Sequence, residues 1–466
     1  MPVSVDLTET IELLERLAAD WRLLDHIPYE ARQRLHRAIT ALASPDPRAR
    51  RKRRKAAQAE TVQREESRLD ETGIRALRRR PTVTTPNIFL PPGLERGDVH
   101  TESSTLNDGP RTGNHEPRTT NDERRASNGE RRTSARACYV CKTTYVRLHA
   151  FYDQLCPACA ETNFAARTEL ADLRGHVALL TGGRVKIGYQ AGLKLLRCGA
   201  HLIATTRFPR NAAARYALEP DFDDWGHRLE IFGLDLRHVP SVEAFCRDLV
   251  ATRERLDFIV NNACQTVRRP PEFYAHMMAE ETSAPRVLPE RARRLLGRSG
   301  REGQDRVDGW PIPVPLSQIP LLTEELAARP HLFPAGQLDV DRQQVDLREQ
   351  NSWRMLLADV PTVEMLEVQL VNAIAPFLFN ARLKPLMLRT PGRNKHIVNV
   401  SAVEGQFYRK FKTTRHPHTN MAKAALNMMT RTSAADYYAD GIHINSVDTG
   451  WVSDEDPLHI AERKTA

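Results

Sequence analysis

Four cysteines in the N-terminal half of the chain are arranged as two CxxC pairs. Cys138 and Cys141 form the first pair, Cys156 and Cys159 form the second, and fourteen residues separate the two pairs. Each CxxC turn brings two sulfurs together, and two such turns complete the tetrahedral thiolate shell that structural zinc prefers. In a reducing compartment this spacing indicates metal binding rather than disulfides. We therefore expect a zinc knuckle over residues 137–166, with all four sulfurs as ligands.

A glycine-rich turn, TGGRVKIG, covers residues 181–188. The apolar run Val177–Leu180 before it is typical of a strand buried on both faces, and the leucines after it recur with helical spacing. A strand, a glycine turn and a helix N-terminus together form a cradle for phosphate, because backbone N–H groups point at the anion. The sequence therefore predicts a nucleotide site at this turn.

Further short apolar runs alternate with helical patterns as far as the C-terminal region. They lie at residues 202–204, 229–234, 258–260, 396–400 and 442–447. Strands that alternate with helices predict a doubly wound parallel sheet, with ligand at the carboxyl ends of the strands. The expected fold class is thus α/β, with a Rossmann sheet over residues 172–466, preceded by the small zinc knuckle and an N-terminal helical hairpin.

Residues 172–452 resemble the short-chain dehydrogenase/reductase superfamily, in an atypical subgroup that carries a zinc knuckle. Five landmarks in the family's order carry the resemblance: TGGRVKIG, Leu234-Asp235-Leu236, NNAC at 261–264, VNAIAPF with Asn372, and VNVSA with Ser401 followed by NMAKAAL with Lys423. The resemblance implies hydride transfer between a nicotinamide cofactor and the carbonyl or alcohol carbon of a small substrate, with the cofactor supplying the difficult chemistry.

The resemblance also implies a catalytic set. Ser401 would polarise the substrate oxygen, Lys423 would hold the nicotinamide ribose and support proton transfer, and Asn372 would carry a proton relay. The family places a tyrosine four residues before the lysine, and here that position is Thr419. An aliphatic hydroxyl cannot be tuned to donate a proton near neutral pH as a phenol can.

Three interpretations of this replacement stay open. In the first, Tyr408 supplies the phenol and completes the catalytic set. In the second, His416 or His418 supplies the proton, since imidazole titrates in the useful range. In the third, no acid remains and the domain binds nucleotide without turnover.

The resemblance assigns the cofactor to a set of residues at the ends of the first strands and in the glycine turn. They are Thr181, Gly182, Arg184, Lys186, Ile187, Gly188, Thr206, Arg207, Asp235, Leu236, Asn262 and, at the nicotinamide end, Lys423. Relatives that prefer NAD place an acid after the second strand, whereas Arg207 would bind a 2′-phosphate through charge-assisted hydrogen bonds. NADP(H) is therefore expected rather than NAD(H). Lys186 replaces the family's middle glycine, and it either blocks the pyrophosphate or points outward and neutralises a phosphate; we favour the second.

Four accessory segments complete the predicted organisation. Residues 1–44 form a helical hairpin, 45–79 a basic charged segment, 80–136 a disordered linker, and 267–353 an insertion in the Rossmann domain at the rim of the cofactor cleft. The basic run RARRKRRK could contact phosphates, but no aromatic platform or groove-reading motif accompanies it, so nucleic acid is not the expected partner. The chain also stops shortly after Trp451, and Thr449 replaces the usual proline of the family.

Composition narrows the class of protein further. The 466-residue chain has a net charge of +9 and no run of eighteen apolar residues, and its acidic N-terminus is unlike a signal peptide. We expect a cytoplasmic protein without a membrane span. Basic residues between 409 and 415 would suit an anionic substrate, while the hairpin and the insertion would suit a protein partner or a homo-oligomer. The alternative to an oxidoreductase is a catalytically weak or inactive NADP(H)-binding regulatory or scaffold protein.

Overall fold

The computed structural model describes residues 8–43, 47–78, 135–282, 288–297, 306–307, 310–311, 313–322, 325–326, 329–339, 343–408, 412–450 and 457. The chain divides into two compact units. One comprises residues 1–80 with 100–164, and the other comprises residues 81–99 with 165–466. The predicted disordered linker at 80–136 lies almost wholly outside the described residues.

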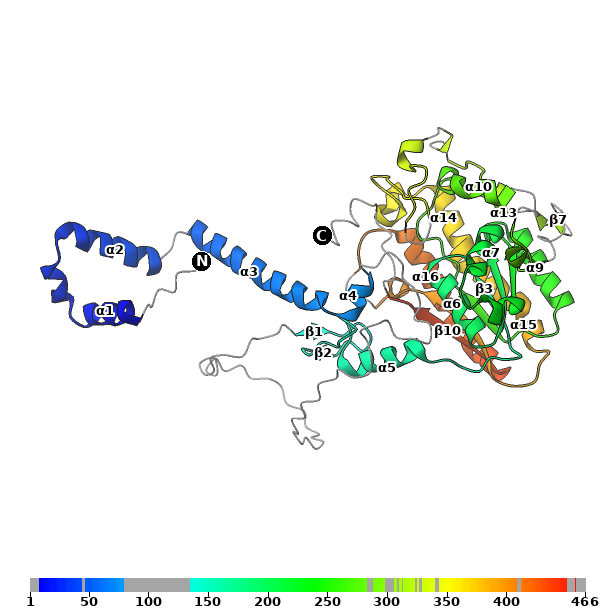
Figure 1. The fold of residues 1–466 in the computed structure, drawn as a ribbon, viewed down its shortest axis with the longest axis horizontal. Helices are drawn as coiled ribbons and strands as arrows, with labels where there is room; N and C mark the ends of the chain where they lie inside the picture. Colours follow the sequence, from blue (N-terminus) through cyan, green and yellow to red (C-terminus); the bar gives the residue numbers. More distant parts are fainter. Residues whose placement is uncertain are drawn as a thin grey trace, which may run out of the picture. The chain divides into compact units, whose positions relative to one another are not determined.

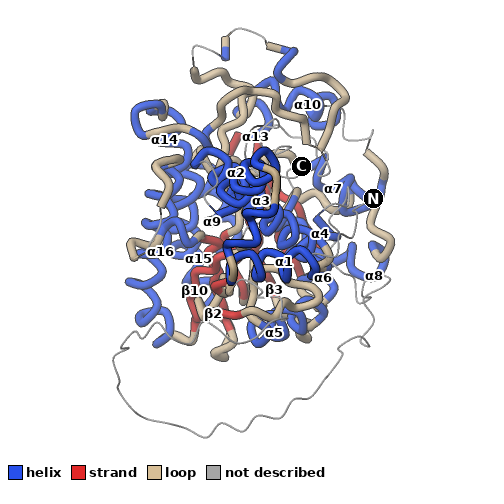
Figure 2. The backbone as a smooth tube through the Cα atoms, turned by 90° about the vertical axis from the view of Figure 1, so that its left-hand side faces the viewer, coloured by secondary structure: helices blue, strands red, loops and turns tan. Residues whose placement is uncertain are grey.

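The second unit contains a six-stranded parallel sheet with helices on both faces (Figure 2). In chain order its strands are β3 (Val177–Thr181), β4 (His201–Thr206), β5 (Leu229–Gly233), β6 (Phe258–Asn261), β9 (Lys395–Ser401) and β10 (Ile442–Asp448). Across the sheet they run β10-β9-β6-β3-β4-β5. Strands β4 and β5 are added on one side of β3, and β6, β9 and β10 on the other. The boundary between β3 and β6 is therefore the switch point outside which open α/β sheets bind their ligands. The doubly wound Rossmann prediction is confirmed.

Each face of the sheet has its own apolar core because the strands carry apolar side chains on both sides. One core joins the sheet to α9 (Val239–Thr252), α15 (Ala375–Met387) and α16 (Pro417–Ala439). The other joins it to α6 (Lys186–Arg197), α7 (Pro209–Ala217), α8 (Phe222–Trp225) and α11 (Glu290–Arg293). All five strands expected after the glycine turn occur within two residues of their predicted bounds, which brings the carboxyl ends of β3, β4, β6 and β9 to one edge.

A π-helical turn at Leu370–Ile374 joins α14 (Thr362–Gln369) to α15. The stretch Thr362–Met387 is long and apolar enough to cross a membrane by length and composition alone, and half of it is buried. Its apolar side chains Val371, Leu378 and Phe379 belong to the core on one face of the sheet. The apolar character of this stretch is therefore accounted for by packing inside the α/β unit.

The insertion between β6 and α14 has little regular structure in its described parts. Short helices lie at η3 (Pro271–Tyr274), α10 (Ala275–Thr282), α13 (Pro313–Leu316) and η6 (Pro330–Leu332), together with a two-stranded pair of β7 (Arg306–Val307) and β8 (Trp310–Pro311). An apolar cluster anchors the segment, combining Phe208 from the β4–α7 connection with Phe273, Tyr274, Met277, Val314 and Phe333. The insertion therefore docks beside the end of β4.

The first unit begins with α1 (Thr8–Ala19), η1 (Trp21–His26) and α2 (Tyr29–Ala43), as the hairpin prediction requires. Trp21 and Tyr29 remain exposed. The long helix α3 (Pro47–Asp70, blue in Figure 1) carries the basic run and leads into α4 (Gly73–Arg78). The knuckle that follows consists of β1 (Arg136–Ala137), β2 (Thr144–Tyr145) and α5 (Pro157–Thr168).

The end of α3 and the start of α4 pack against the cysteine-bearing segment. Backbone N–H groups of Gly73 and Ile74 donate to the carbonyls of Ala150 (2.9 Å) and Phe151 (2.8 Å). Arg75 donates to Asp153 at 3.0 Å, and the Asp153 side chain is buried. The basic segment is thus fastened to the knuckle at its C-terminal end, a contact that sequence patterns did not predict.

Candidate active site

The glycine turn and the NNAC segment form one corner at the switch point. Thr181, the last residue of β3, accepts through its Oγ1 from the backbone N–H groups of Asn262 (3.1 Å) and Ala263 (3.0 Å). The Asn262 Nδ2 donates to the carbonyls of Thr181 (3.0 Å) and Gly182 (3.2 Å). Gly182 has φ of +70°, and a Cβ there would lie 2.9 Å from Ala263 Cα, so only glycine fits. Asn262 therefore supports the turn rather than facing open solvent.

Lys186 begins α6 with φ of +53°, in the left-handed region that glycine adopts easily and lysine does not. This is the position of the family's middle glycine, so the backbone keeps the glycine conformation although the side chain has changed. Gly188 is under a stricter limit, because a Cβ there would lie 2.1 Å from the Gly182 carbonyl oxygen. Ile187 between them is half-buried. The frame of the turn is thus preserved.

Two guanidinium groups lie beside this corner, one after β3 and the other after β4. Arg184 is 6% exposed and donates to Asn211 Oδ1 (3.1 Å) and to Gln343 Oε1 (3.3 Å) of the insertion. Burial lowers its pKa to about 10. Arg207 follows β4 and the buried Thr206, donates to the Tyr274 hydroxyl at 2.6 Å, and lies over that ring. Within the described part of the chain, neither guanidinium has a carboxylate at ion-pair distance.

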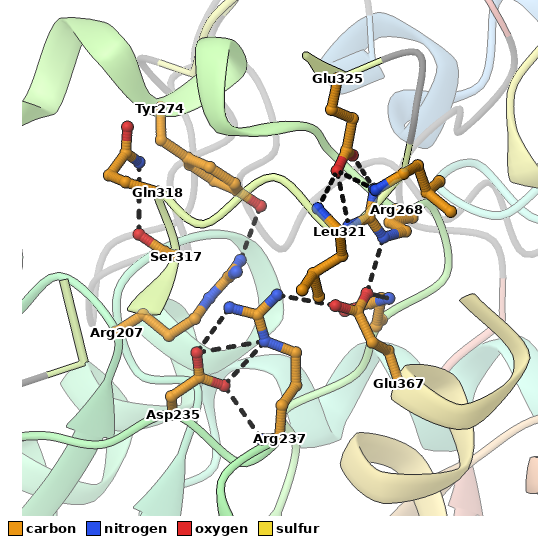
Figure 3. A network of polar contacts seen from close by, with 12 residues as sticks. Arg207, Asp235, Arg237, Arg268, Tyr274, Ser317, Gln318, Leu321, Glu325 and Glu367 are labelled. Atoms are coloured by element: carbon orange, nitrogen blue, oxygen red, sulfur yellow. Dashed lines mark hydrogen bonds and ion pairs between the residues drawn. The ribbon is translucent and has the colours of Figure 1, made fainter. Parts of the chain in front are cut away.

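Asp235, the predicted adenine contact, is held by a network of charges (Figure 3). Arg237 Nη2 lies 2.6 Å from Asp235 Oδ2, and its Nη1 lies 2.9 Å from Glu367 Oε1. Burial alone would raise the pKa of Asp235, but the Arg237 guanidinium outweighs it and holds that pKa below its ordinary value. Arg268 then joins Glu367 to Glu325. The carboxylate assigned to the cofactor is therefore already bound by arginine.

Leu236, the next residue assigned to the adenine, is a buried member of the apolar core on the α9 face. Its side chain packs inside the protein, so any contact with a nucleotide would be made by its backbone. Leu236 therefore matches the family by its position just after a strand, and not by a side chain that is exposed to a ligand.

Ser401 and Lys423 come together at the carboxyl end of β9. Ser401 is the last residue of that strand, and its Oγ donates to Asn427 Oδ1 on α16 at 2.6 Å. Lys423, one turn earlier on α16, donates through Nζ to the Val400 carbonyl at 2.7 Å. Both side chains are buried, at 7% and 5% exposure. Asn427, four residues after Lys423, was missed from the sequence although its helical spacing places it on the same face.

Asn372 lies within the π-helical turn and is fully buried. Its Oδ1 accepts from the backbone N–H of Gln265 at 2.7 Å, and its Nδ2 donates to the carbonyl of Gln265 at 3.1 Å. A π-turn inside an α-helix occurs frequently at functional sites. Asn372 therefore fixes the loop that follows β6 at Gln265, which lies three residues beyond Asn262.

Thr419 is 4% exposed, and its Oγ1 has no hydrogen-bond partner among the described residues. It lies one helical turn before Lys423 and is the residue that replaces the family tyrosine. Tyr408 lies at the other extreme: its side chain is 98% exposed. Since Ser401 and Lys423 are buried, this geometry does not support Tyr408 as the proton donor.

The two candidate histidines are buried at the start of α16. The His416 ring stacks on Trp353, with centroids 4.0 Å apart, and its Nδ1 has no described partner. Burial lowers the pKa of His416. His418 Nε2 lies 3.3 Å from Glu364 Oε1; burial would raise the pKa of that carboxyl, but His418 and Ser352 outweigh it and lower the pKa. Both imidazoles thus lie within three residues of Thr419, on its N-terminal side.

The cysteine quartet is assembled as its spacing predicts. The Sγ atoms of Cys138, Cys141, Cys156 and Cys159 all lie within 4.8 Å of one another. The cluster lies at the turn between β1 and β2 and at the start of α5, where Ala160 is fully buried. Four sulfurs at such distances form a donor set suited to a tetrahedral thiophilic metal.

The sheet order and the strand-end constellation define a Rossmann-type α/β protein. Residues 349–464 match the profile of a family described as enoyl-(acyl carrier protein) reductase. The chain is 29% identical over 345 residues to uncharacterized protein R665 of Acanthamoeba polyphaga mimivirus, covering 69% of this chain and 65% of that one. It is 36% identical over 107 residues to dehydrogenase/reductase SDR family member 13 of Bos taurus, covering 22% of this chain and 28% of that one.

Together with the ordered landmarks, these matches support the resemblance of the Rossmann domain to the short-chain dehydrogenase/reductase superfamily. The chain spans less than two-thirds of the length of these two relatives. A solved metagenomic short-chain oxidoreductase in complex with NADP covers 63% of this chain and 90% of its own, with 19% identity and a TM-score of 0.38.

Proposed function

We propose that the chain is an NADP(H)-dependent oxidoreductase that acts on a carbonyl or alcohol carbon. The observation that carries the proposal is the joint burial of Ser401 and Lys423 at the carboxyl end of β9, next to the switch point. The Ser401 hydroxyl can donate to a substrate oxygen, and the Lys423 ammonium lies close enough to the same strand end to hold a ribose and lower the pKa of an acid.

The residues of the glycine corner fit a dinucleotide. Gly182 and Gly188 leave no room for a Cβ, so backbone approaches backbone closely there. The guanidinium of Arg184 is buried and has no carboxylate at ion-pair distance among the described residues. Arg207 would bind the 2′-phosphate and Lys186 would neutralise the pyrophosphate. When bound, the nicotinamide would supply or accept the hydride. The protein would orient the substrate oxygen through Ser401.

The source of the proton decides between the open interpretations. His416 and His418 are buried beside Thr419, whereas Tyr408 lies in solvent. We favour an imidazole of this pair as the acid, because both histidines are buried at the start of the helix that carries Lys423, and an imidazole nitrogen can both donate and accept a proton. His416→Gln, His418→Gln and Tyr408→Phe, assayed side by side, would identify the donor by which variant loses kcat.

The test begins with calorimetric titration of the purified chain with NADPH and NADH. NADPH oxidation is then followed across a panel of aldehydes and ketones. Lys423→Ala should reduce turnover on the order of a hundredfold or more, while Lys194→Ala on α6 should leave it unchanged. Tight NADPH binding without turnover of any carbonyl would refute the proposed oxidoreductase activity but not the proposed nucleotide-binding site.

The second candidate function is an NADP(H)-binding regulatory or scaffold protein. The unpartnered Thr419 hydroxyl at the tyrosine position and the exposed Tyr408 favour it. In this case the exposed Trp21 and Tyr29 of the N-terminal hairpin would contact a protein partner. Thr419→Tyr separates the two functions, because a gain of carbonyl reduction would show a complete pocket that lacks only its acid.

We also propose that the cysteine quartet binds one structural zinc ion. Its support is the convergence of four sulfurs within 4.8 Å. Metal analysis of the purified chain should give one equivalent of zinc, which Cys138→Ser together with Cys156→Ser should abolish. Retention of zinc in that double variant would refute the assignment.

A further inference from the structure

The N-terminus of α7 is capped by a carboxylate from the insertion. Glu281 of α10 accepts from the backbone N–H of Asn211 at 2.8 Å and from that of Arg210 at 3.3 Å. Glu281 is 6% exposed, so this is a buried contact between segments seventy residues apart in the chain. Backbone N–H groups at a helix N-terminus attract anions, and here the chain supplies the anion itself.

This capped helix begins directly after Arg207, since Phe208 is its N-cap residue. Asn211 connects the cap to the second guanidinium: its Oδ1 accepts from Arg184 at 3.1 Å while its own backbone N–H donates to Glu281. Its Nδ2 donates to Glu280 at 2.9 Å. The Glu281 carboxylate thus occupies the N-terminus of α7, where the helix end would otherwise receive an external anion, and Asn211 links this position to Arg184.

The same insertion segment also engages Arg207. Tyr274, seven residues before Glu281, accepts from the Arg207 guanidinium at 2.6 Å and lies under it at 4.7 Å from the ring centroid. Tyr274 and Met277 hold the segment in the apolar cluster with Phe208. One short stretch of the insertion therefore binds both the helix end and the arginine that would read a 2′-phosphate.

We propose that residues 271–282 act as a built-in competitor of NADP(H), with the Glu281 carboxylate in the place of the 2′-phosphate. This inference rests on the proposed NADP(H) site and adds its regulation. Binding of a 2′-phosphorylated nucleotide requires Glu281 to leave the α7 N-terminus, because two anions at one helix end repel each other. Nucleotides without that phosphate make no such demand.

An isosteric variant tests the inference. Glu281→Gln keeps an oxygen that can accept from the α7 backbone and removes only the charge. Its matched control is Glu280→Gln, the neighbouring residue that contacts the Asn211 side chain instead of the helix end. The probes are adenosine 2′,5′-bisphosphate, adenosine 5′-monophosphate, NADPH and NADH, each titrated calorimetrically into the full chain.

Glu281→Gln should tighten binding of adenosine 2′,5′-bisphosphate and NADPH on the order of tenfold and leave the other two unchanged. Glu280→Gln should change none of the four. An unchanged or weaker affinity of Glu281→Gln for the bisphosphate would overturn the inference, while NADPH binding by the wild-type chain would still support the proposed function. No binding of any nucleotide to any variant would remove both.

Hydrogen exchange gives a second measurement that needs no substitution. Amides of residues 271–282 in the wild-type chain should exchange faster when adenosine 2′,5′-bisphosphate is added, because the segment is displaced from α7. Adenosine 5′-monophosphate should leave them unchanged. Slower exchange with the bisphosphate would mean that the segment closes over the phosphate, contrary to the inference.

Discussion

The Asn372 side chain and the backbone of Gln265 exchange two hydrogen bonds, at 2.7 and 3.1 Å. Gln265 also donates through Nε2 to Glu367 at 3.0 Å, so the loop after β6 is tied to α14 and to the π-turn at once. Asn372, at the position that the resemblance assigns to a proton relay, therefore supports the loop beside the glycine turn. Its loss should affect stability as well as chemistry.

Asn372→Ala should lower the free energy of unfolding by about 2–3 kcal/mol, because it leaves both backbone groups of Gln265 without partners in a buried place. Urea denaturation followed by circular dichroism measures the change. Asn394→Ala, at an exposed position, is the control and should shift stability by less than about 0.5 kcal/mol. Equal stability of the two variants would show that water replaces the amide.

Lys186→Gly should raise the free energy of unfolding of the second unit by about 1 kcal/mol, because the left-handed backbone conformation at this position is strained for lysine but not for glycine. Thermal unfolding measures it. Lys194→Gly, in the interior of the same helix, is the opposite control and should destabilise by about 1 kcal/mol. NADPH affinity of Lys186→Gly gives an additional result: a fall supports a phosphate contact by the ammonium, and a rise supports steric blocking.

The advantage of Glu281→Gln over the wild-type chain in NADPH affinity should depend on pH. Burial raises the pKa of Glu281 to about 7. The backbone donors of α7 and the charge of Arg210 oppose this rise, whereas the neighbouring charge of Glu280 adds to it. Arg184 also interacts electrostatically with the Glu281 carboxylate. Above that pH the carboxylate is ionised and repels a 2′-phosphate, whereas below it the group is neutral.

The ratio of the two affinities should therefore approach one near pH 5 and reach its full value near pH 8.5. Taking the ratio for one ligand cancels the titration of the phosphate itself. A ratio that stays constant across this range would contradict ionisation of Glu281 as the cause.

Removal of metal should loosen the first unit without unfolding the Rossmann domain. Chelation should expose the buried contact between Arg75 and Asp153 and make the α4 region sensitive to protease, since structural zinc sites contribute folding free energy. Limited proteolysis with mass spectrometry locates the cuts. Cys264→Ser, an exposed cysteine outside the quartet, should behave like the wild type. New cuts confined to residues 165–466 would contradict the expectation.

The sheet was predictable because its strands are local signals: short apolar runs such as Val177–Leu180 are visible without knowledge of the rest of the chain. The cysteine quartet was predictable for the same reason, since the spacing of the four ligands is visible in one short stretch of the sequence. The contacts of Arg184 and Glu281 were not, because both depend on where an insertion without hydrophobic periodicity docks. The docking of Gly73 on Phe151 was likewise a tertiary contact, across a stretch that no local pattern connects.

The neighbouring strands β6 and β9 belong to distant parts of the chain, and their buried amides Asn261 and Asn399 meet across 138 residues at 2.8 Å. Loop closure costs only about 0.6 kcal/mol for each doubling of length, so the native state tolerates the insertion. The effect on folding rate is larger, because the chain entropy is lost on closing the loop before any stabilising contact between the two strands has formed. The half of the sheet before the insertion, β3 to β6, can form early, and β9 and β10 join it in a later and slower step.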